Sequence, residues 1–282
     1  MTSPAVSDVA DGDLIELDGD VLEPLEDDAP DEGDEKTEKR ESSPSFSREP
    51  RARFERLLHP MPRERRRARA LEAEEPDLSA FCHDPDPGVI RAVTKNLHAG
   101  LTHARLIAAH HRHAGGLASL LTRPEWLKDS RVTTLLVRNP RTPDVMLRRI
   151  LARERLLSLV RFAQDRDAPE RNRVWIRRYL QERFRKARPD ERVASIMAGE
   201  GRILGLIDGV PFDERTSRLL ANRRIGSQVL IRNLARYPGT STIVLEALLR
   251  LPLVKRQGML QAMIRRHPNA PPRGRAGPGA PR

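Results

Sequence analysis

The stretch that decides the fold is Asn139-Pro-Arg-Thr-Pro-Asp-Val-Met-Leu-Arg-Arg-Ile-Leu151. Its second half is amphipathic, because Leu147, Ile150 and Leu151 recur at the three- and four-residue spacing of one helical face. Its first half is a turn, because the residue before a proline avoids the α conformation and so ends the preceding helix at Asn139. The stretch therefore predicts a helix, a sharp turn and a second helix.

The same unit occurs twice more along the chain. The segment Tyr237-Pro-Gly-Thr-Ser-Thr-Ile-Val-Leu-Glu-Ala-Leu-Leu249 aligns with it without a gap, and Asn222-Arg-Arg-Ile-Gly226 precedes Val229-Leu230 in the same register. In this pattern Thr142 and Thr240 are predicted to cap the helices that follow them.

Further helix starts and turns follow from local chemistry. Proline needs no backbone N–H, so Pro87, Pro143 and Pro169 are predicted to lie in first helical turns. The pair Gly115-Gly116 is predicted to form a turn.

The spacing of the turns indicates a repeat. Turns fall near residues 84, 96, 111, 124, 139, 152 and 165, and again near 222, 237, 252 and 267. Two helix-turn units make about 26–30 residues, a period typical of helical solenoids. One short amphipathic helix cannot bury its apolar stripe alone, but stacked neighbours can. We therefore predict an all-α fold, a right-handed α-solenoid of short helix-turn repeats, with an irregular helical bundle as the alternative.

The repeated unit resembles the HEAT-like and leucine-rich-repeat-variant α-solenoids of bacteria. The resemblance covers roughly residues 77–270 and weakens over 170–212, where one long helix replaces the turn. It implies a binding scaffold with no catalytic residues and no cofactor. Some leucine-rich-repeat-variant proteins carry a cysteine-ligated iron–sulfur module, which this chain lacks because Cys82 is its only cysteine.

Charge divides the chain into an acidic start and a basic body. Residues 1–50 carry 17 acids and four bases, a net charge of −13, whereas residues 51–282 carry 47 bases and 23 acids, a net charge of +24. Such acidic, Pro/Gly/Ser-rich sequence cannot bury enough apolar surface to fold. The predicted organisation is a disordered acidic tail (1–48), a basic helical lead-in (49–76), helical repeats (77–168), the long basic helix with irregular helices (169–212), further repeats (213–267) and a disordered Pro/Gly/Arg tail (268–282).

No apolar run reaches the roughly 20 residues that a membrane helix needs, and no apolar signal region opens the chain. We therefore expect a cytoplasmic protein without a transmembrane segment.

The strongest local feature is a helix predicted over Pro169–Ala187. Trp175, Ile176, Tyr179, Leu180 and Phe184 share one half of it, and residues 171–188 hold eight bases and one acid. Arginines in such a stripe contact phosphates or an acidic protein surface, although a solvated face on a core helix has the same pattern. A second basic run lies in 51–70. The candidate anion or nucleic-acid contacts are Arg171, Arg173, Arg177, Arg178, Arg185, Arg188, Arg65, Arg66 and Arg67.

Six histidines fall within residues 83–113, and His110 and His113 are one helical turn apart, so both could face one metal ion. No carboxylate or thiol completes a metal-binding spacing such as H-E-x-x-H, so we predict no metal site. These histidines are expected on polar helix faces, with some pH sensitivity near neutrality. No nucleotide-binding or nucleophile motif occurs, so no catalytic or cofactor-binding residue is assigned.

These features favour a non-enzymatic scaffold that binds a protein partner. The first alternative is a nucleic-acid-binding solenoid that uses its arginine surface, with the acidic tail as an intramolecular competitor. A remote alternative is a glycosylase similar to the HEAT-like DNA glycosylases, with Asp165, Asp208 and Trp175 in the groove.

Overall fold

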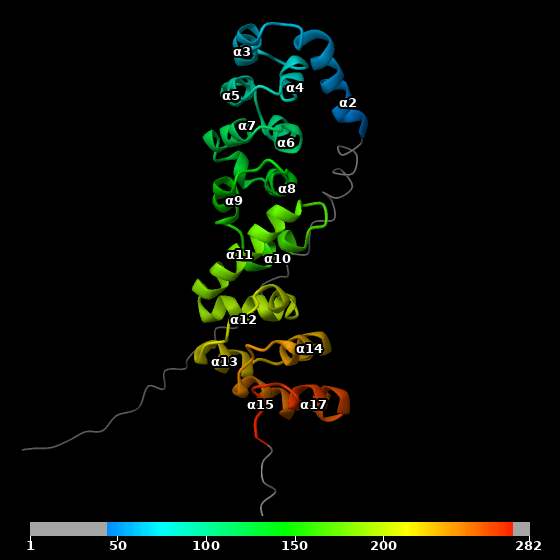
Figure 1. Ribbon diagram of the computed structural model, residues 1–282, viewed down its shortest axis with the longest axis vertical. Coiled ribbons are helices and arrows are strands. Elements are labelled where there is room, and N and C mark those ends of the chain that lie inside the picture. The colour runs from blue at the N-terminus through cyan, green and yellow to red at the C-terminus, as the bar shows by residue number, and fades with distance from the viewer. Residues whose placement is uncertain (1–43, 273–282) are drawn as a thin grey trace, which may run out of the picture. The chain divides into compact units, whose positions relative to one another are not determined.

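A computed structural model describes residues 44–272, and every regular element in that range is a helix (Figure 1). The chain divides into a unit of Met1–Pro44 and a unit of Ser45–Arg282. The α-helices are α2 (Pro44–Arg53), α3 (Arg63–Glu72), α4 (Asp77–Phe81), α5 (Pro87–Lys95), α6 (Leu101–His110), α7 (Ala114–Ser119), α8 (Ser130–Arg138), α9 (Asp144–Leu151), α10 (Leu156–Gln164), α11 (Glu170–Lys186), α12 (Pro189–Ala198), α13 (Glu214–Ala221), α14 (Gln228–Arg236), α15 (Thr242–Arg250), α16 (Pro252–Lys255) and α17 (Gly258–Arg265). Phe54–Leu58 is a π-helix, η1, and the 3-10 helices are η2 (Leu120–Thr122), η3 (Trp126–Lys128) and η4 (Arg202–Leu206).

Most of the predicted tails lie outside the described residues. Residues 1–43 and 273–282 are not described, so the predictions made for them stay predictions. Helix α2 begins at Pro44, inside the segment predicted as the acidic tail (1–48). Proline at the first helical position needs no backbone N–H, so Pro44 is compatible with a helix start as well as with a tail.

The helices pack mainly on near neighbours in the chain, with a helix often packing on the next but one. Thus α5 packs on α3 and α7, α6 packs on α4 and α8, and α13 packs on α12 and α15. Figure 1 shows α3, α5, α7 and α9 in one column and α4, α6 and α8 in a second column beside it. Helices of this length are marginal alone in water, so their stability comes from this packing.

The predicted apolar stripes form the core. The fully or almost fully buried members are Val132, Leu136, Leu147, Ile150, Leu151, Leu156, Leu245, Leu248, Leu260 and Ile264. Leu135, Leu249 and Met263 are partly buried and pack against this core. The all-α prediction is confirmed for the described residues.

Asparagine side chains join successive units at the helix ends. The Asn139 amide nitrogen donates to the Ala108 carbonyl at 2.8 Å and to the His111 carbonyl at 2.9 Å, while its oxygen accepts from the Arg141 N–H at 2.9 Å. The Asn96 amide does the same for the carbonyls of Ala70 and Ala73, at 3.0 and 2.8 Å.

Asn172 and Asn269 repeat this double donation, to Val137 and Asn139 and to Pro238 and Thr240 respectively. A helix leaves its last four carbonyls without an intrahelical partner. Each of these asparagines therefore satisfies two main-chain carbonyls that lie in, or just after, an earlier helix.

Both threonines predicted to cap the following helix bond to the preceding helix instead. The Thr142 hydroxyl donates to the Leu136 carbonyl at 2.6 Å and the Thr240 hydroxyl to the Leu234 carbonyl at 2.8 Å. The prediction that they cap the following helix is therefore wrong. Both hydroxyls are fully buried and close the end of the preceding helix instead, where orphan carbonyls need donors.

The proline and glycine predictions are partly corrected. Pro87 does occupy the first position of α5, but Pro143 and Pro169 lie one residue before α9 and α11. Gly115 and Gly116 lie inside α7 rather than in a turn, because the ring nitrogen of His113 accepts a hydrogen bond from the Gly115 N–H at 3.1 Å and caps that helix.

Candidate functional site

The predicted long basic helix is present, and one of its faces is buried in the core. It runs from Glu170 to Lys186 as α11, one residue short of the prediction at each end, and buries Ile176, Tyr179, Leu180 and Phe184 as predicted. Trp175 is only partly buried and stacks on Tyr179, with ring centroids 5.2 Å apart. The apolar half of α11 therefore belongs to the core, and its polar half carries the arginines.

The arginines of this region separate into two groups. Arg171 is paired with Asp144 at 2.6 Å, and Arg173 and Arg177 share Glu170 at 2.5 and 3.1 Å. The remaining three, Arg178, Arg185 and Arg188, are exposed, and none has an acidic partner among residues 44–272. We call these three the free arginine group, because their charge is available to a ligand.

The second basic run has a different role. Arg66 is largely buried, donates to Asp84 at 2.7 Å and to the Met61 carbonyl at 2.8 Å, and so connects α3 to the turn before α5. The guanidinium of Arg66 therefore stabilises the fold, whereas Arg65 and Arg67 are exposed. The three candidate contacts in this run therefore do not form one surface.

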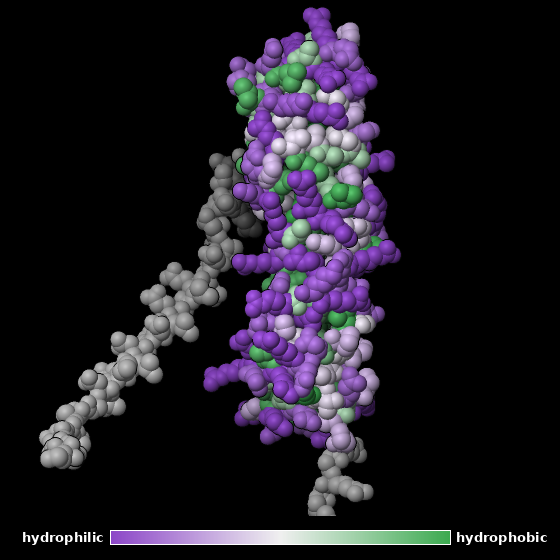
Figure 2. Space-filling view, turned by 90° about the vertical axis from the view of Figure 1, so that its left-hand side faces the viewer, coloured by the Kyte–Doolittle hydropathy of each residue, from purple (hydrophilic) through white to green (hydrophobic). Residues whose placement is uncertain are grey.

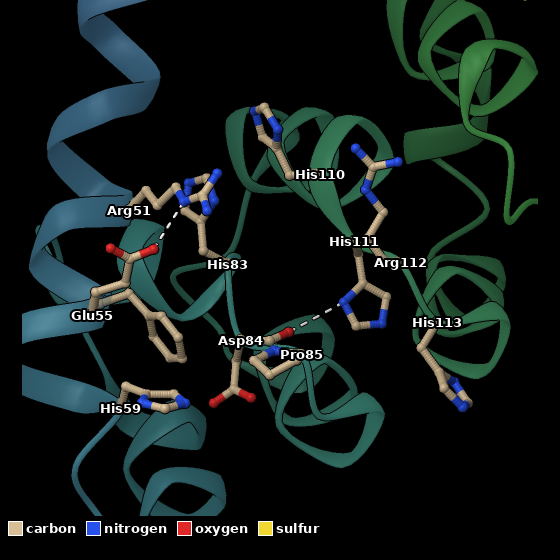
Figure 3. A pocket seen from close by; sticks show the side chains of 11 residues that line it. Arg51, Glu55, His59, His83, Asp84, Pro85, His110, His111, Arg112 and His113 are labelled. Carbon is tan, nitrogen blue, oxygen red and sulfur yellow. Dashed lines mark hydrogen bonds and ion pairs between the residues drawn. The ribbon is translucent and has the colours of Figure 1, made fainter.

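A pocket of about 710 Å³ lies where three chain segments meet (Figure 3). The segments are α2 with η1, the turn between α4 and α5, and the end of α6 with the turn after it. Five histidines and two arginines line it, so we call it the histidine pocket. Its lining residues are Arg51, Phe54, Glu55, His59, His83, Asp84, Pro85, His110, His111, Arg112 and His113.

Two histidines from different segments face each other in this pocket. The centroids of the His83 and His110 rings lie 5.0 Å apart, and Nε2 of His83 is buried with no hydrogen-bond partner among residues 44–272. Burial, together with nearby His110 and Arg51, lowers the pKa of His83 to about 4, although Glu55 partly opposes the shift. Burial, Arg112 and Arg51 also lower the pKa of His110. Both rings are therefore neutral at pH 7.

His111 has a structural role in the pocket wall. Its Nδ1 lies 3.2 Å from the Asp84 carbonyl, and its ring packs on Gly116, where a Cβ atom would lie only 1.9 Å from Nε2. Burial lowers the pKa of His111 despite the hydrogen bond to that carbonyl. Only glycine at 116 leaves room for this imidazole.

The suggestion that His110 and His113 lie on one helix is wrong. Helix α6 ends at His110, and His113 turns away to cap α7. Within residues 44–272, no three His, Cys, Asp or Glu side chains lie around one point in a way that could hold a metal ion. Cys82 is buried and its Sγ contacts the Leu78 carbonyl at 3.5 Å.

The residues considered for a glycosylase do not form one site. Asp165 ends α10 and is paired with Arg138 at 2.8 Å. Asp208 lines a separate pocket of about 470 Å³ that neither Asp165 nor Trp175 lines. Trp175 lies on α11 against Tyr179.

Sequence reasoning missed the part of the histidine pocket that comes from α2 and η1. Arg51, Glu55 and His59 precede the histidine-rich segment by more than twenty residues, and no spacing in the sequence connects them to it. Arg51 and Glu55 are spaced for one helical face, and this was the only signal.

Comparison with family models, with curated proteins and with solved structures finds no match to this chain. The structure supports an all-helical protein of short helices packed mostly on near neighbours. None of the helices in residues 44–272 is both long and apolar enough to cross a membrane.

Proposed function

We propose that this chain is a non-enzymatic scaffold that binds a protein partner, built as a right-handed α-solenoid similar to the HEAT-like and leucine-rich-repeat-variant proteins. The observation that carries the proposal is the repeated junction at which Asn96, Asn139 and Asn269 each bond two carbonyls of an earlier unit. Units joined in this way add surface with each repeat, and such surfaces serve binding in helical-repeat proteins.

The free arginine group supports an acidic partner. Arg178, Arg185 and Arg188 are exposed close to one another in sequence, at and just beyond the end of α11. The body as a whole carries +24, so it attracts acidic surfaces. Hydrophilic residues dominate the face seen in Figure 2, where hydrophobic residues form separate small spots. Recognition on this face therefore depends on charge more than on a broad apolar patch.

A nucleic acid is the second candidate, favoured by the same free arginine group. Arginine neutralises phosphates without reading sequence, and the resulting affinity falls steeply with salt. In this version the acidic residues 1–50, with a net charge of −13, compete for the basic surface. A full chain with its acidic residues in 1–43 neutralised would then bind DNA or RNA more tightly than the native chain at low salt.

Site-specific photo-crosslinking in native cell lysate tests the proposal. The crosslinker replaces Arg178 or Arg185, and a matched control replaces Arg218, which is equally exposed on α13 but paired with Glu214. We expect a protein adduct at 178 and 185, unchanged by nuclease and absent at 218. Adducts that nuclease removes would favour the nucleic-acid candidate, and equal yields at all three positions would contradict both.

The glycosylase alternative has a separate test. An enzyme of that kind would release bases from alkylated DNA and lose that activity in an Asp165→Asn or Asp208→Asn variant. Because these two side chains lie in different places, we expect no activity in the native chain.

A further inference from the structure

The histidine pocket is rich in N–H donors. Arg51 and Arg112 line it from two different segments. Its two acids are already engaged, since Glu55 accepts from Arg51 at 3.0 Å and the fully buried Asp84 accepts from Arg66 at 2.7 Å. An arginine has five N–H donors, so the bond from Arg51 Nε to Glu55 leaves its other donors available. An anion is therefore the ligand that this lining favours.

The volume of the pocket and its apolar wall also suit a ligand larger than an inorganic ion. Its volume of about 710 Å³ lies within the range of roughly 300–1,000 Å³ that small-molecule sites occupy. Pro85 is exposed and supplies apolar surface, and the almost fully buried ring of Phe54 lies behind the wall in edge contact with His59. An organic group can lie on this wall while its anionic end meets the arginines.

We propose that the histidine pocket binds a small organic phosphate. Arg51 and Arg112 hold the phosphate oxygens as charged donors, as guanidinium groups do in phosphate sites. His83 and His110 line the pocket beside the arginines and donate further hydrogen bonds from their ring N–H groups. Figure 3 shows these four side chains around the central opening of the pocket.

Binding at this site is coupled to pH. Both histidines are neutral at pH 7, and a phosphate beside them favours their protonated forms, so the ligand binds more tightly as the pH falls. All the titratable and charged groups that line the pocket enter this balance. They are Arg51, Glu55 and His59 from α2 and the π-helical segment, His83 and Asp84 from the turn before α5, and His110, His111, Arg112 and His113 from the end of α6 and the turn after it.

Calorimetric titration of the full chain at pH 7.5 tests the ligand class. Phenyl phosphate and inorganic phosphate are the two probes, because they share the anionic group and differ in the organic body. We expect saturable binding of both, with phenyl phosphate tighter. Arg112→Gln is expected to weaken both by about tenfold, the effect of one charged contact. Arg56→Gln is the matched control, since Arg56 is equally exposed in the adjacent π-helix but does not line the pocket.

The pH coupling needs a probe whose own charge is constant. Inorganic sulfate is a dianion at both pH 5.5 and pH 7.5, so any change in its affinity comes from the protein. We expect tighter sulfate binding at pH 5.5, and we expect sulfate to raise the pKa of His83 and His110 in histidine NMR titrations. A His83→Asn variant should bind phosphate but lose part of the pH dependence.

Three results would overturn the proposal. The first is absence of saturable phosphate binding in the native chain. The second is equal affinity in Arg112→Gln and Arg56→Gln, which would place the anion elsewhere. The third is equal affinity for phenyl phosphate and inorganic phosphate, which would remove the organic body from the assignment. Arg112 is exposed, and its side chain makes no hydrogen bond or ion pair within residues 44–272, so its substitution leaves the fold intact.

Discussion

Replacing Asn139 by alanine removes one complete junction between units. The side chain is 3% exposed, and its amide donates to the carbonyls of Ala108 and His111 while its oxygen holds the turn at Arg141. Each net hydrogen bond contributes about 1 kcal/mol, and a buried group left without a partner costs about 1–3 kcal/mol. Two carbonyls are left in this variant, so we expect a loss of about 2–4 kcal/mol in the free energy of unfolding.

The control is the corresponding turn residue Asn222. It aligns with Asn139 in the repeat, also follows a helix directly, and is exposed, with no side-chain hydrogen bond in the described part of the chain. Asn222→Ala should therefore change the free energy of unfolding by less than about 0.5 kcal/mol. Urea unfolding followed by circular dichroism measures both variants through their midpoints at an unchanged m value. Equal destabilisation by the two substitutions would refute the reasoning about the junction.

Three further predictions follow from single contacts. Thr142→Val keeps the shape but removes the buried hydroxyl that closes α8, and should cost about 1–2 kcal/mol in urea unfolding. Gly116→Ala should cost about 1–3 kcal/mol because the new methyl meets the His111 ring, whereas Gly226→Ala, with open space around it, should be nearly neutral in the same assay. The pKa of His83 is about 4 when folded and about 6.5 when unfolded, so the unfolded state binds more protons between these values and stability falls as the pH drops through that window. The loss should be about 1–2 kcal/mol after allowance for the partial exposure of this ring. The melting temperature should therefore fall less between pH 7 and pH 4.5 in a His83→Asn variant than in the native chain, and an equal fall in both would contradict the reasoning.

The turn at Asn139 shows what local sequence predicts and what it does not. The helix stripes and the position of the turn follow from residues within one helical turn of each other, and they were predicted correctly. The partners of the turn side chains do not follow, because Asn139 and Thr142 bond whichever carbonyls the neighbouring helices present. Those carbonyls become neighbours only after the units stack, and no spacing within the turn encodes this.

The histidine pocket also combines features that the local sequence predicts with contacts that depend on packing. The concentration of histidines and a turn near residue 111 were both predicted from the sequence, and α6 ends at His110 in agreement with that turn. That helix end turns His113 away and leaves His110 opposite His83. Arg51 joins them from a segment that was predicted only as a basic lead-in.

The central claim is that each unit is stabilised chiefly by the units next to it, and amide hydrogen exchange of the Asn139→Ala variant tests it most directly. In a chain of nearest-neighbour units, loss of one junction destabilises the elements beside it and leaves distant ones protected. We therefore predict faster exchange in α6, α8 and α9 and unchanged exchange in α14, α15 and α17. A uniform rise in exchange across all these helices would show one cooperative core instead and would contradict the account.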